Sequence, residues 1–197
     1  QHQRIVFNGN GYAPEWEKEA RRRGLPVLPS MVDAIPALTT DKAVELFGEF
    51  GVFTKTELES RAEIQYEIYA KAINIEAKTM VDMATKQIIP AVIKYTTVLA
   101  ESINQVKAVG PIDVSVQMDL LKKASKLLKE VNSTMNKLSK LVDQIETHPE
   151  GRDRAVFCRE KLVPAMEKLR EPVDELEMLV DKDMWPMPSY GDLVFEP

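Results

Sequence analysis

The chain has 197 residues, of which 44% are hydrophobic, 29% charged and 7% aromatic. This composition is typical of a folded domain with one core and excludes a disordered or fibrous chain. Lysine and arginine number 26 against 31 aspartates and glutamates, a net charge of −5. The overall field therefore does not favour nucleic acid, an anionic membrane or an acidic substrate as a partner.

Two further absences narrow the protein class. No stretch of the sequence approaches the roughly 18 apolar residues of a membrane span, and the chain does not open with a signal peptide. The single cysteine, Cys158, cannot form an internal disulfide, and no Cys/His spacing resembles a zinc site. We therefore expect a cytoplasmic protein in which Cys158 is a small buried side chain; the alternative, a reactive thiol, requires an electropositive, partly exposed pocket.

Glycines and prolines interrupt the first fifty residues. The segment 8–11, Asn-Gly-Asn-Gly, tolerates positive φ and predicts a tight turn at a strand end or loop. Short helices are expected over 14–23 and over 42–50, the second capped by Asp41, and each is followed by a glycine. The chain begins without methionine, which we interpret as a sign that it is a piece of a longer protein.

The pattern changes at Thr54, which forms a capping box with Glu57 and predicts the start of a long helix. This helix is expected over 55–109, with a kink at Pro90 because the proline ring clashes with the preceding turn. Its apolar stripe advances in steps of four and three residues. The stripe comprises Ile73, Ala77, Met80, Ala84, Ile88, Ala91, Tyr95 and Val98.

A second long helix is expected over 113–147, after the break at Gly110-Pro111 and with Asp113 as its cap. It carries a sustained heptad-like seam. The seam comprises Val114, Met118, Leu121, Ala124, Leu128, Val131, Met135, Leu138, Val142 and Ile145.

A third helix is expected over 150–182, bent at Pro164 and Pro172. Short connections between long helices make neighbours antiparallel. We therefore predict an all-α fold, an elongated antiparallel three-helix bundle over 55–182 on a small irregular helical base over 1–54. The third helix carries an apolar stripe of Leu162, Met166, Leu169, Val173, Leu176 and Val180.

The last segment, 183–197, is apolar and broken by prolines, and it has no helical period. Three large aromatic side chains, Trp185, Tyr190 and Phe195, are costly to leave in water. We expect them to dock on the bundle or on whatever precedes Gln1.

Residues that carry catalysis are scarce. Of two histidines, His2 lies at the terminus and His148 lies in a turn, where it is expected to help cap the preceding helix. No nucleophile constellation or phosphate-binding loop is present, and the segment 9–11 is only half of a dinucleotide-binding fingerprint. We assign no catalytic, cofactor-binding or metal-binding residue in this chain.

Charged clusters at helical spacing predict solvated helix faces. A group of carboxylates surrounds Arg61, with which ordinary ion pairs are expected. A group of lysines could form an anion patch, but a solvent face is favoured, and the methionines are expected to fill the core or to form an adaptable partner surface. The clusters are Glu57, Glu59, Glu63 and Glu67, and Lys122, Lys123, Lys126 and Lys129.

Three separated strings, however, are not required by helix physics. They are RIVFNGNGY over 4–12, parts of the stretch 72–91, and WPMPSYGDL over 185–193. Together, and in this order, they resemble the C-terminal portion of type III glutamine synthetases. The segments 27–38 and 50–53 are similar to the helical segment that closes the catalytic domain of glutamine synthetases in general.

The resemblance implies that 1–54 is the tail of a catalytic domain, that 55–182 is the helical extension of type III enzymes, and that 183–197 is a tail docking back on them. It implies a ring-forming, cytoplasmic glutamate–ammonia ligase as the parent protein. There ATP phosphorylates the glutamate γ-carboxylate, ammonia displaces the phosphate, and Mg²⁺ or Mn²⁺ holds the nucleotide. The metal-binding and arginine motifs of that domain are absent here, so we expect the chain to be inactive alone.

The favoured interpretation is a C-terminal helical domain with a structural, assembly or regulatory role, whose partners are its own catalytic domain and neighbouring subunits. One alternative is a stand-alone adaptor that binds a partner protein through its heptad seams. A carboxylate enzyme built in a helix bundle is disfavoured, because the Glu-x-x-His pairs of di-iron proteins are absent.

Overall fold

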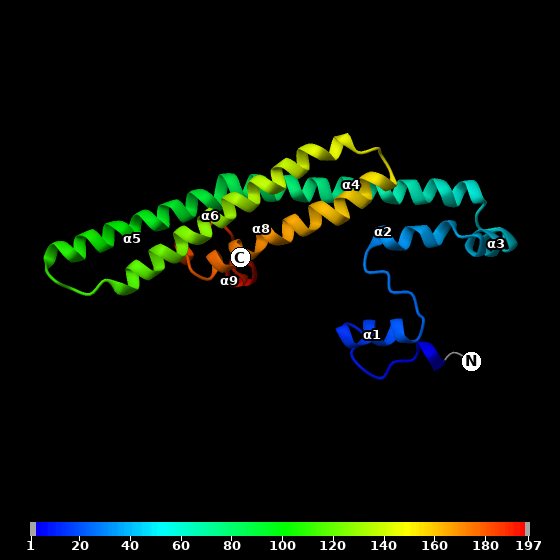
Figure 1. Ribbon diagram of the computed structural model, residues 1–197, viewed down its shortest axis with the longest axis horizontal. Helices are drawn as coiled ribbons and strands as arrows, with labels where there is room; N and C mark the ends of the chain where they lie inside the picture. Colours follow the sequence, from blue (N-terminus) through cyan, green and yellow to red (C-terminus); the bar gives the residue numbers. More distant parts are fainter. Residues whose placement is uncertain (1–2, 196–197) are drawn as a thin grey trace. The chain divides into compact units, whose positions relative to one another are not determined.

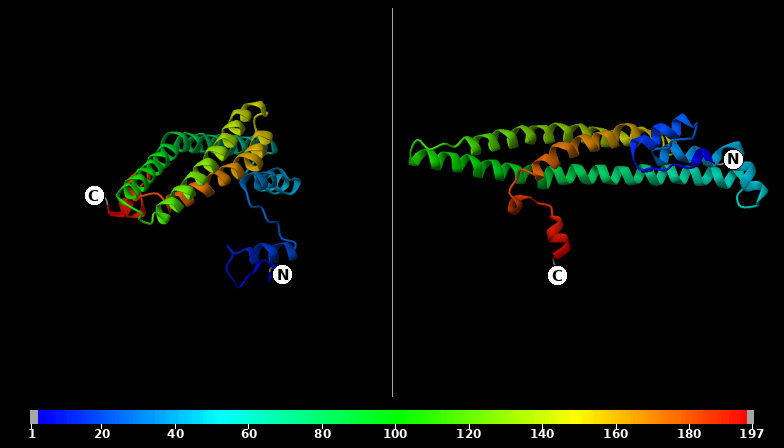
Figure 2. Two further views of the ribbon diagram at one scale, coloured as in Figure 1. Left: turned by 60° about the vertical axis from the view of Figure 1, so that its left-hand side comes forward. Right: turned by 90° about the horizontal axis from the view of Figure 1, so that it is seen from below.

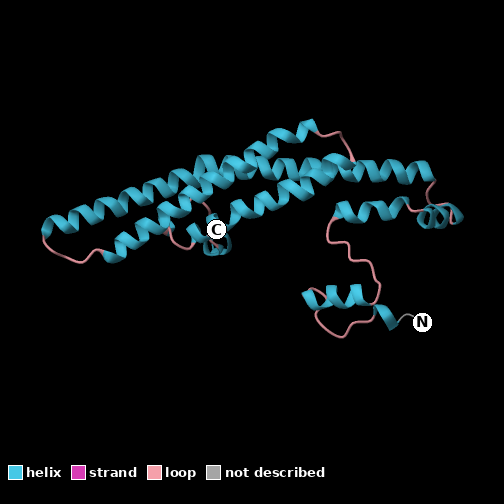
Figure 3. Ribbon diagram, in the orientation of Figure 1, coloured by secondary structure: helices cyan, strands magenta, loops and turns pink. Residues whose placement is uncertain are grey.

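The computed structural model describes residues 3–195, and every regular element among them is helical (Figures 1 and 3). The predicted all-α class is therefore confirmed. The chain divides into two compact units, one up to Tyr66 and the other from Glu67 onward. This division falls inside a helix, and the expected domain boundary at residue 54 stays a prediction.

The first unit contains short helices followed by the start of a long one. Gly24 and Gly51 follow α1 and α3 with φ of 67° and 62°, a backbone conformation that glycine adopts without steric cost. The cap of α3 is Thr40, whose Oγ1 accepts the Ala43 N–H at 3.3 Å, so the expected cap Asp41 is instead the first helical residue. The elements are η1 (Gln3–Ile5), α1 (Pro14–Arg22), α2 (Met31–Ala34), η2 (Ile35–Thr39), α3 (Asp41–Glu49) and the first part of α4 (Lys55–Met83).

The N-terminal segment folds back on α1. The guanidinium of Arg23 donates hydrogen bonds to the carbonyl oxygens of Arg4 and Val6 at 3.0 and 2.6 Å. The rings of Phe7 and Trp16 lie 4.8 Å apart between centroids. The turn expected after Phe7 is a loop rather than a strand end.

The capping box at the start of α4 forms as predicted. The Thr54 N–H donates to Glu57 Oε2 at 2.7 Å, and the Glu57 N–H donates to Thr54 Oγ1 at 3.3 Å. Each residue thus satisfies a backbone donor that the helix leaves open.

In the second unit, a π-helical turn lies directly before a proline in the first long helix. After α4 come η3 (Ala84–Ile88), the π turn, and α5 (Ile89–Val109). The Ile89 N–H donates to the carbonyl of Ala84, five residues back. Pro90 follows at once, so the helix accommodates the proline through a wide turn, as helices often do where the normal ladder is interrupted.

The third long helix repeats this arrangement. The Val163 N–H donates to the carbonyl of Cys158, again five residues back, and Pro164 comes next. The disturbances predicted at Pro90 and Pro164 therefore have one form, whereas Pro172 lies within continuous α-helix. The elements of this helix are α7 (Arg152–Phe157), η5 (Cys158–Leu162) and α8 (Val163–Glu177).

The middle helix, α6 (Ser115–Gln144), packs against both of the others, with α5 and α8 as its main neighbours (Figures 1 and 2). Asp113 Oδ1 accepts the Ser115 N–H at 2.9 Å, as its expected capping role requires. A short 3-10 helix, η4 (Ile145–Thr147), ends α6 before the turn to α7.

The core of this unit largely follows the predicted stripes, with two corrections. On α6, Leu127 is 4% exposed and takes the core position expected for Leu128, which is half-buried. The two residues are adjacent, and a step of three after Ala124 fits helical spacing as well as a step of four. On α5, Val98 is 45% exposed and Leu99 is buried, because the core continues from the buried Tyr95 in a step of four residues rather than three.

The C-terminal segment is more ordered than the sequence predicts. After η6 (Lys182–Met184), residues Tyr190–Phe195 form α9, a short helix in a segment whose sequence has no helical period. The Ser189 N–H donates to Asp192 Oδ2 at 2.7 Å, and the Asp192 N–H donates back to Ser189 Oγ at 3.3 Å. This second capping box starts a helix too short for an apolar period to show.

The tail aromatics differ in exposure. Trp185 is half-buried, whereas Tyr190 and Phe195 are 88% and 84% exposed, and α9 points away from the neighbouring helices (Figure 2). Docking of those two rings on a segment that precedes Gln1 stays a prediction.

Candidate functional site

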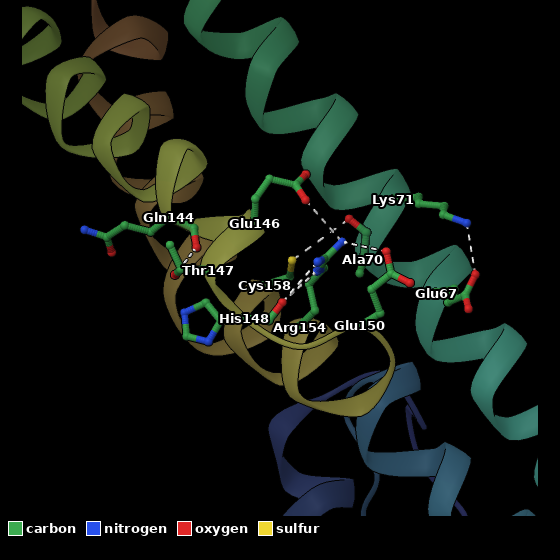
Figure 4. A network of polar contacts seen from close by, with 10 residues as sticks. All are labelled: Glu67, Ala70, Lys71, Gln144, Glu146, Thr147, His148, Glu150, Arg154 and Cys158. Atoms are coloured by element: carbon green, nitrogen blue, oxygen red, sulfur yellow. Dashed lines mark hydrogen bonds and ion pairs between the residues drawn. The ribbon is translucent and has the colours of Figure 1, made fainter.

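Cys158 is fully buried, as predicted. It lies in the π turn η5, and its Sγ donates a weak hydrogen bond to the carbonyl of Ala70 at 4.0 Å (Figure 4). Burial raises the pKa of the thiol, and nearby Arg154 only partly opposes this. A protonated, enclosed thiol is a poor nucleophile, so Cys158 is a packing residue.

The turn between α6 and α7 is held by Arg154 (Figure 4). Its guanidinium donates twice to the carbonyl of His148, at 3.2 and 3.0 Å, and lies 3.5 Å from the carboxylates of Glu146 and Glu150. The His148 ring stacks on Phe157 with centroids 4.0 Å apart, while its backbone N–H caps η4. These interactions stabilise the turn between α6 and α7, and they account for each of these groups by local structure.

The lysine cluster lies on a solvent-exposed face of α6, as favoured from sequence. Lys122 and Lys126 pair with Asp119 and Glu130 on the same helix at 3.6 and 3.8 Å. Lys123 lies 4.0 Å from Glu175 of α8, and these side chains are all about half exposed or more. Exposed pairs of this kind contribute little free energy.

The carboxylate cluster of α4 serves local structure. Glu57 belongs to the capping box, and Glu59 and Glu67 pair with lysines four residues away at 3.8 and 3.0 Å. Glu63 is exposed. The guanidinium of Arg61 lies over the Phe53 ring, 4.3 Å from its centroid, so a cation–π contact accompanies its electrostatic attraction to Glu57.

Within residues 3–195, no three His, Cys, Asp or Glu side chains lie close enough to hold a metal ion. The residues present therefore do not fit the Mg²⁺ or Mn²⁺ that the resemblance implies for the parent, and no chemical step is derived through them. His2 lies outside the described residues.

No helix in the described part of the chain is both long enough and apolar enough to cross a lipid bilayer.

One feature of the second unit has the form of a ligand site. A pocket of about 290 Å³ opens between the first long helix, at its π turn, and α8, and the tail closes one side. Its size is near the lower limit of small-molecule sites. Its apolar lining consists of Met80, Met83, Ala84, Ile88, Leu169, Val173 and Met187.

Three charged side chains complete the lining of this pocket. Arg170 Nε donates to Asp174 Oδ2 at 3.1 Å, so these two charges compensate each other. Glu177, the last residue of α8, makes no hydrogen bond or ion pair with any described residue. The pocket therefore combines an apolar interior with one uncompensated negative charge.

The pocket cannot be predicted from the sequence, because its walls come from three distant segments. The one pattern that could have pointed to it is the pair Met80 and Met83, three residues apart on one helix. Another hollow, of about 470 Å³, lies between the first long helix and the tail and is lined partly by Lys86, Gln87 and Lys94. Lys86 is paired with Asp82 there.

The comparisons with known proteins give the family. Residues 1–107 match the family model of the glutamine synthetase C-terminal domain, which is more than half of the chain. The chain belongs to this family. The matched region ends within α5, so α6 to α9 lie beyond it.

Comparison with individual glutamine synthetases extends the similarity beyond residue 107 to nearly the whole chain. A glutamine synthetase of Butyrivibrio fibrisolvens is 34% identical over 98% of the chain, and a type-3 glutamine synthetase of Dictyostelium discoideum is 33% identical over 99%. A glutamine synthetase of Bacteroides fragilis is 31% identical over 97%. The chain spans only 27% to 28% of the length of these relatives.

Proposed function

We propose that this chain is the C-terminal helical part of a type III glutamine synthetase, a cytoplasmic glutamate–ammonia ligase. Its role there is packing, subunit assembly or regulation, without an active site of its own. The observation that carries the proposal is the match of 97% to 99% of the chain to glutamine synthetases, one of them named type-3.

The exposed apolar surface of the first unit supports this proposal. Tyr12 is fully exposed, Phe50 is 71% exposed, and Ile5, Val6 and Val52 are each more than half exposed. Exposed apolar side chains of this kind, here in the two segments 5–12 and 50–52, are typical of a surface that another protein part covers. In the proposed parent that part is the catalytic domain of the same polypeptide.

Chemistry in the parent is assigned to residues outside this chain. The catalytic domain would supply the carboxylates, histidines and arginines that hold ATP and Mg²⁺ or Mn²⁺. This chain would contribute through contacts with that domain and with neighbouring subunits of a ring. The adaptor alternative is weakened because the α6 seam is occupied: Leu127, Val131 and Leu138 are 0% to 4% exposed.

The test is the mass of the natural gene product, measured by immunoblotting a lysate of the source organism with an antibody raised against this chain. Since the relatives are between three and four times longer than the chain, a band three to four times the chain's own mass supports the proposal. A band at the mass of the 197-residue chain would refute it.

The role within the parent is tested by removing residues 67–197 from the whole ligase. We expect the remaining enzyme to lose its ring assembly, measured by native mass spectrometry, or the response of its γ-glutamyl-transfer activity to effectors. Unchanged assembly and unchanged regulation would show that the helical part serves neither role.

A further inference from the structure

The pocket beside the π turn η3 is not explained by packing or by the proposed assembly role. Its apolar walls are supplied by α4, η3, α8 and Met187 of the tail. Three of these walls are methionines, whose thioethers are flexible and polarizable and make favourable contacts with aromatic rings. The pocket is thus suited to an aromatic or alkyl group of a small molecule.

The charge at the mouth of the pocket indicates which polar group the ligand should carry in addition to its apolar part. Arg170 Nε donates to Asp174 Oδ2, so these two opposite charges compensate each other and Glu177 leaves the mouth with a net negative charge. Glu177 lies at the C-terminal end of α8, where the helix dipole is negative and a cation is favoured. The last turn of α8 nevertheless carries no basic side chain, so the negative end of the helix and Glu177 both lack a cation.

From this charge complementarity we propose that the pocket binds a small organic cation, an ammonium group carried by an aryl or alkyl chain. The chain enters among Met80, Met83 and Met187, and the ammonium group lies at the mouth beside Glu177. This proposal concerns the chain itself and is independent of ligase activity.

The test uses three probes that share one phenylbutyl body and differ only in their head group: 4-phenylbutylammonium, 4-phenylbutanol and 5-phenylpentanoate. Binding to the 197-residue chain is measured by calorimetry and by the fluorescence of Trp185, which lies two residues from Met187. Trp16→Phe removes the second of the two tryptophans and retains a ring beside Phe7. We expect the ammonium probe to bind about fivefold more tightly than the alcohol, and the carboxylate probe to bind most weakly.

Variants assign the preference to the pocket. Glu177→Gln should remove the preference for the ammonium probe and leave the affinity for the alcohol unchanged. Glu175→Gln is the matched control, because Glu175 is two residues away, faces Lys123 and does not line the pocket; its preference should remain. Val173→Phe fills the pocket and should abolish binding of all three probes, with circular dichroism verifying that the variant is folded.

Three results would overturn the proposal. One is equal affinity of the three probes for the native chain. The second is a preference for the ammonium probe that persists in Glu177→Gln. The third is no binding of the ammonium probe tighter than roughly 1 mM.

Discussion

At the scale of single residues, the carboxylate of Glu57 makes the stability of the start of α4 depend on pH. It accepts hydrogen bonds from the Thr54 N–H and hydroxyl at 2.7 and 2.8 Å, and the backbone bond is the main reason that its pKa lies below the ordinary 4.5. A carboxylate whose pKa is depressed by folding stabilises the folded state above its unfolded pKa. That stabilisation is lost as the pH falls toward the folded pKa.

We therefore expect the Glu57→Gln variant to melt at a lower temperature than the unsubstituted 197-residue chain at pH 7. The difference in melting temperature should shrink below about pH 4.5. Thermal melting followed by circular dichroism across this pH range measures it. Glu63→Gln, an exposed site on the same helix and outside the cap, is the control. A difference in melting temperature that stays constant with pH would show that the charge of Glu57 does not contribute.

The two capping boxes also show what local patterns reveal. Thr54 and Glu57 were recognised because a long apolar period follows them. Ser189 and Asp192 have the same spacing and the same reciprocal hydrogen bonds. Hydrogen bonds to the carboxylate from the Ser189 hydroxyl, the Ser189 N–H and Lys182 lower the pKa of Asp192 to about 2. This second capping box was missed because α9 is only six residues long, so its sequence shows no helical period.

At the scale of helices, the sequence predicted the order of the long elements and most of their limits, but not the end of the third helix at Glu177 instead of residue 182 or the π turns before Pro90 and Pro164. Breaks at Gly110 and at residues 148–151 lie where stripes end, so helix limits could be found from the pattern. A π turn adds one residue to a helix without any marker residue of its own. The exchange of Val98 for Leu99 in the core has another cause, because the residues after the π turn keep the predicted stripe as far as Tyr95 and the next step is four residues instead of three.

The neighbours Leu127 and Leu128 give a direct test of the register of α6. Leu127→Asp places a carboxylate at a position that is 4% exposed, where it cannot be hydrated, and we expect a loss of several kcal/mol and an unfolded bundle. Leu128→Asp changes a half-buried position and should cost less, about 1 to 2 kcal/mol. Urea unfolding followed by circular dichroism measures both, and equal losses would show that the register of α6 is wrong.

At the scale of the whole molecule, the family could be recognised from short stretches of sequence, whereas the pocket could be recognised only from the three-dimensional structure. The strings over 4–12 and 185–193 lie in a loop and a tail, where helix physics demands no particular residue, so they carry the resemblance. The pocket could not be predicted, because Met83, Val173 and Met187 are brought together only by the packing of α4, α8 and the tail.

The tail gives the last prediction, since its two parts differ in burial. Met184 and Trp185 are half-buried in the second unit, and η6 packs against α5. The side chains of Tyr190 and Phe195 in α9 are almost fully exposed. A chain ending at Ser189 should therefore keep the melting temperature of the 197-residue chain. A chain ending at Asp181 should melt lower, by on the order of 5 °C.

Differential scanning calorimetry of the two truncated chains distinguishes these cases. Both lack α9, so only the loss of residues 182–189 separates them, and the shorter chain also loses Met187 from the wall of the pocket. Equal melting temperatures would show that the half-buried Trp185 does not stabilise the bundle. A drop already present in the chain ending at Ser189 would place the stabilising contacts in α9 instead, against its exposure.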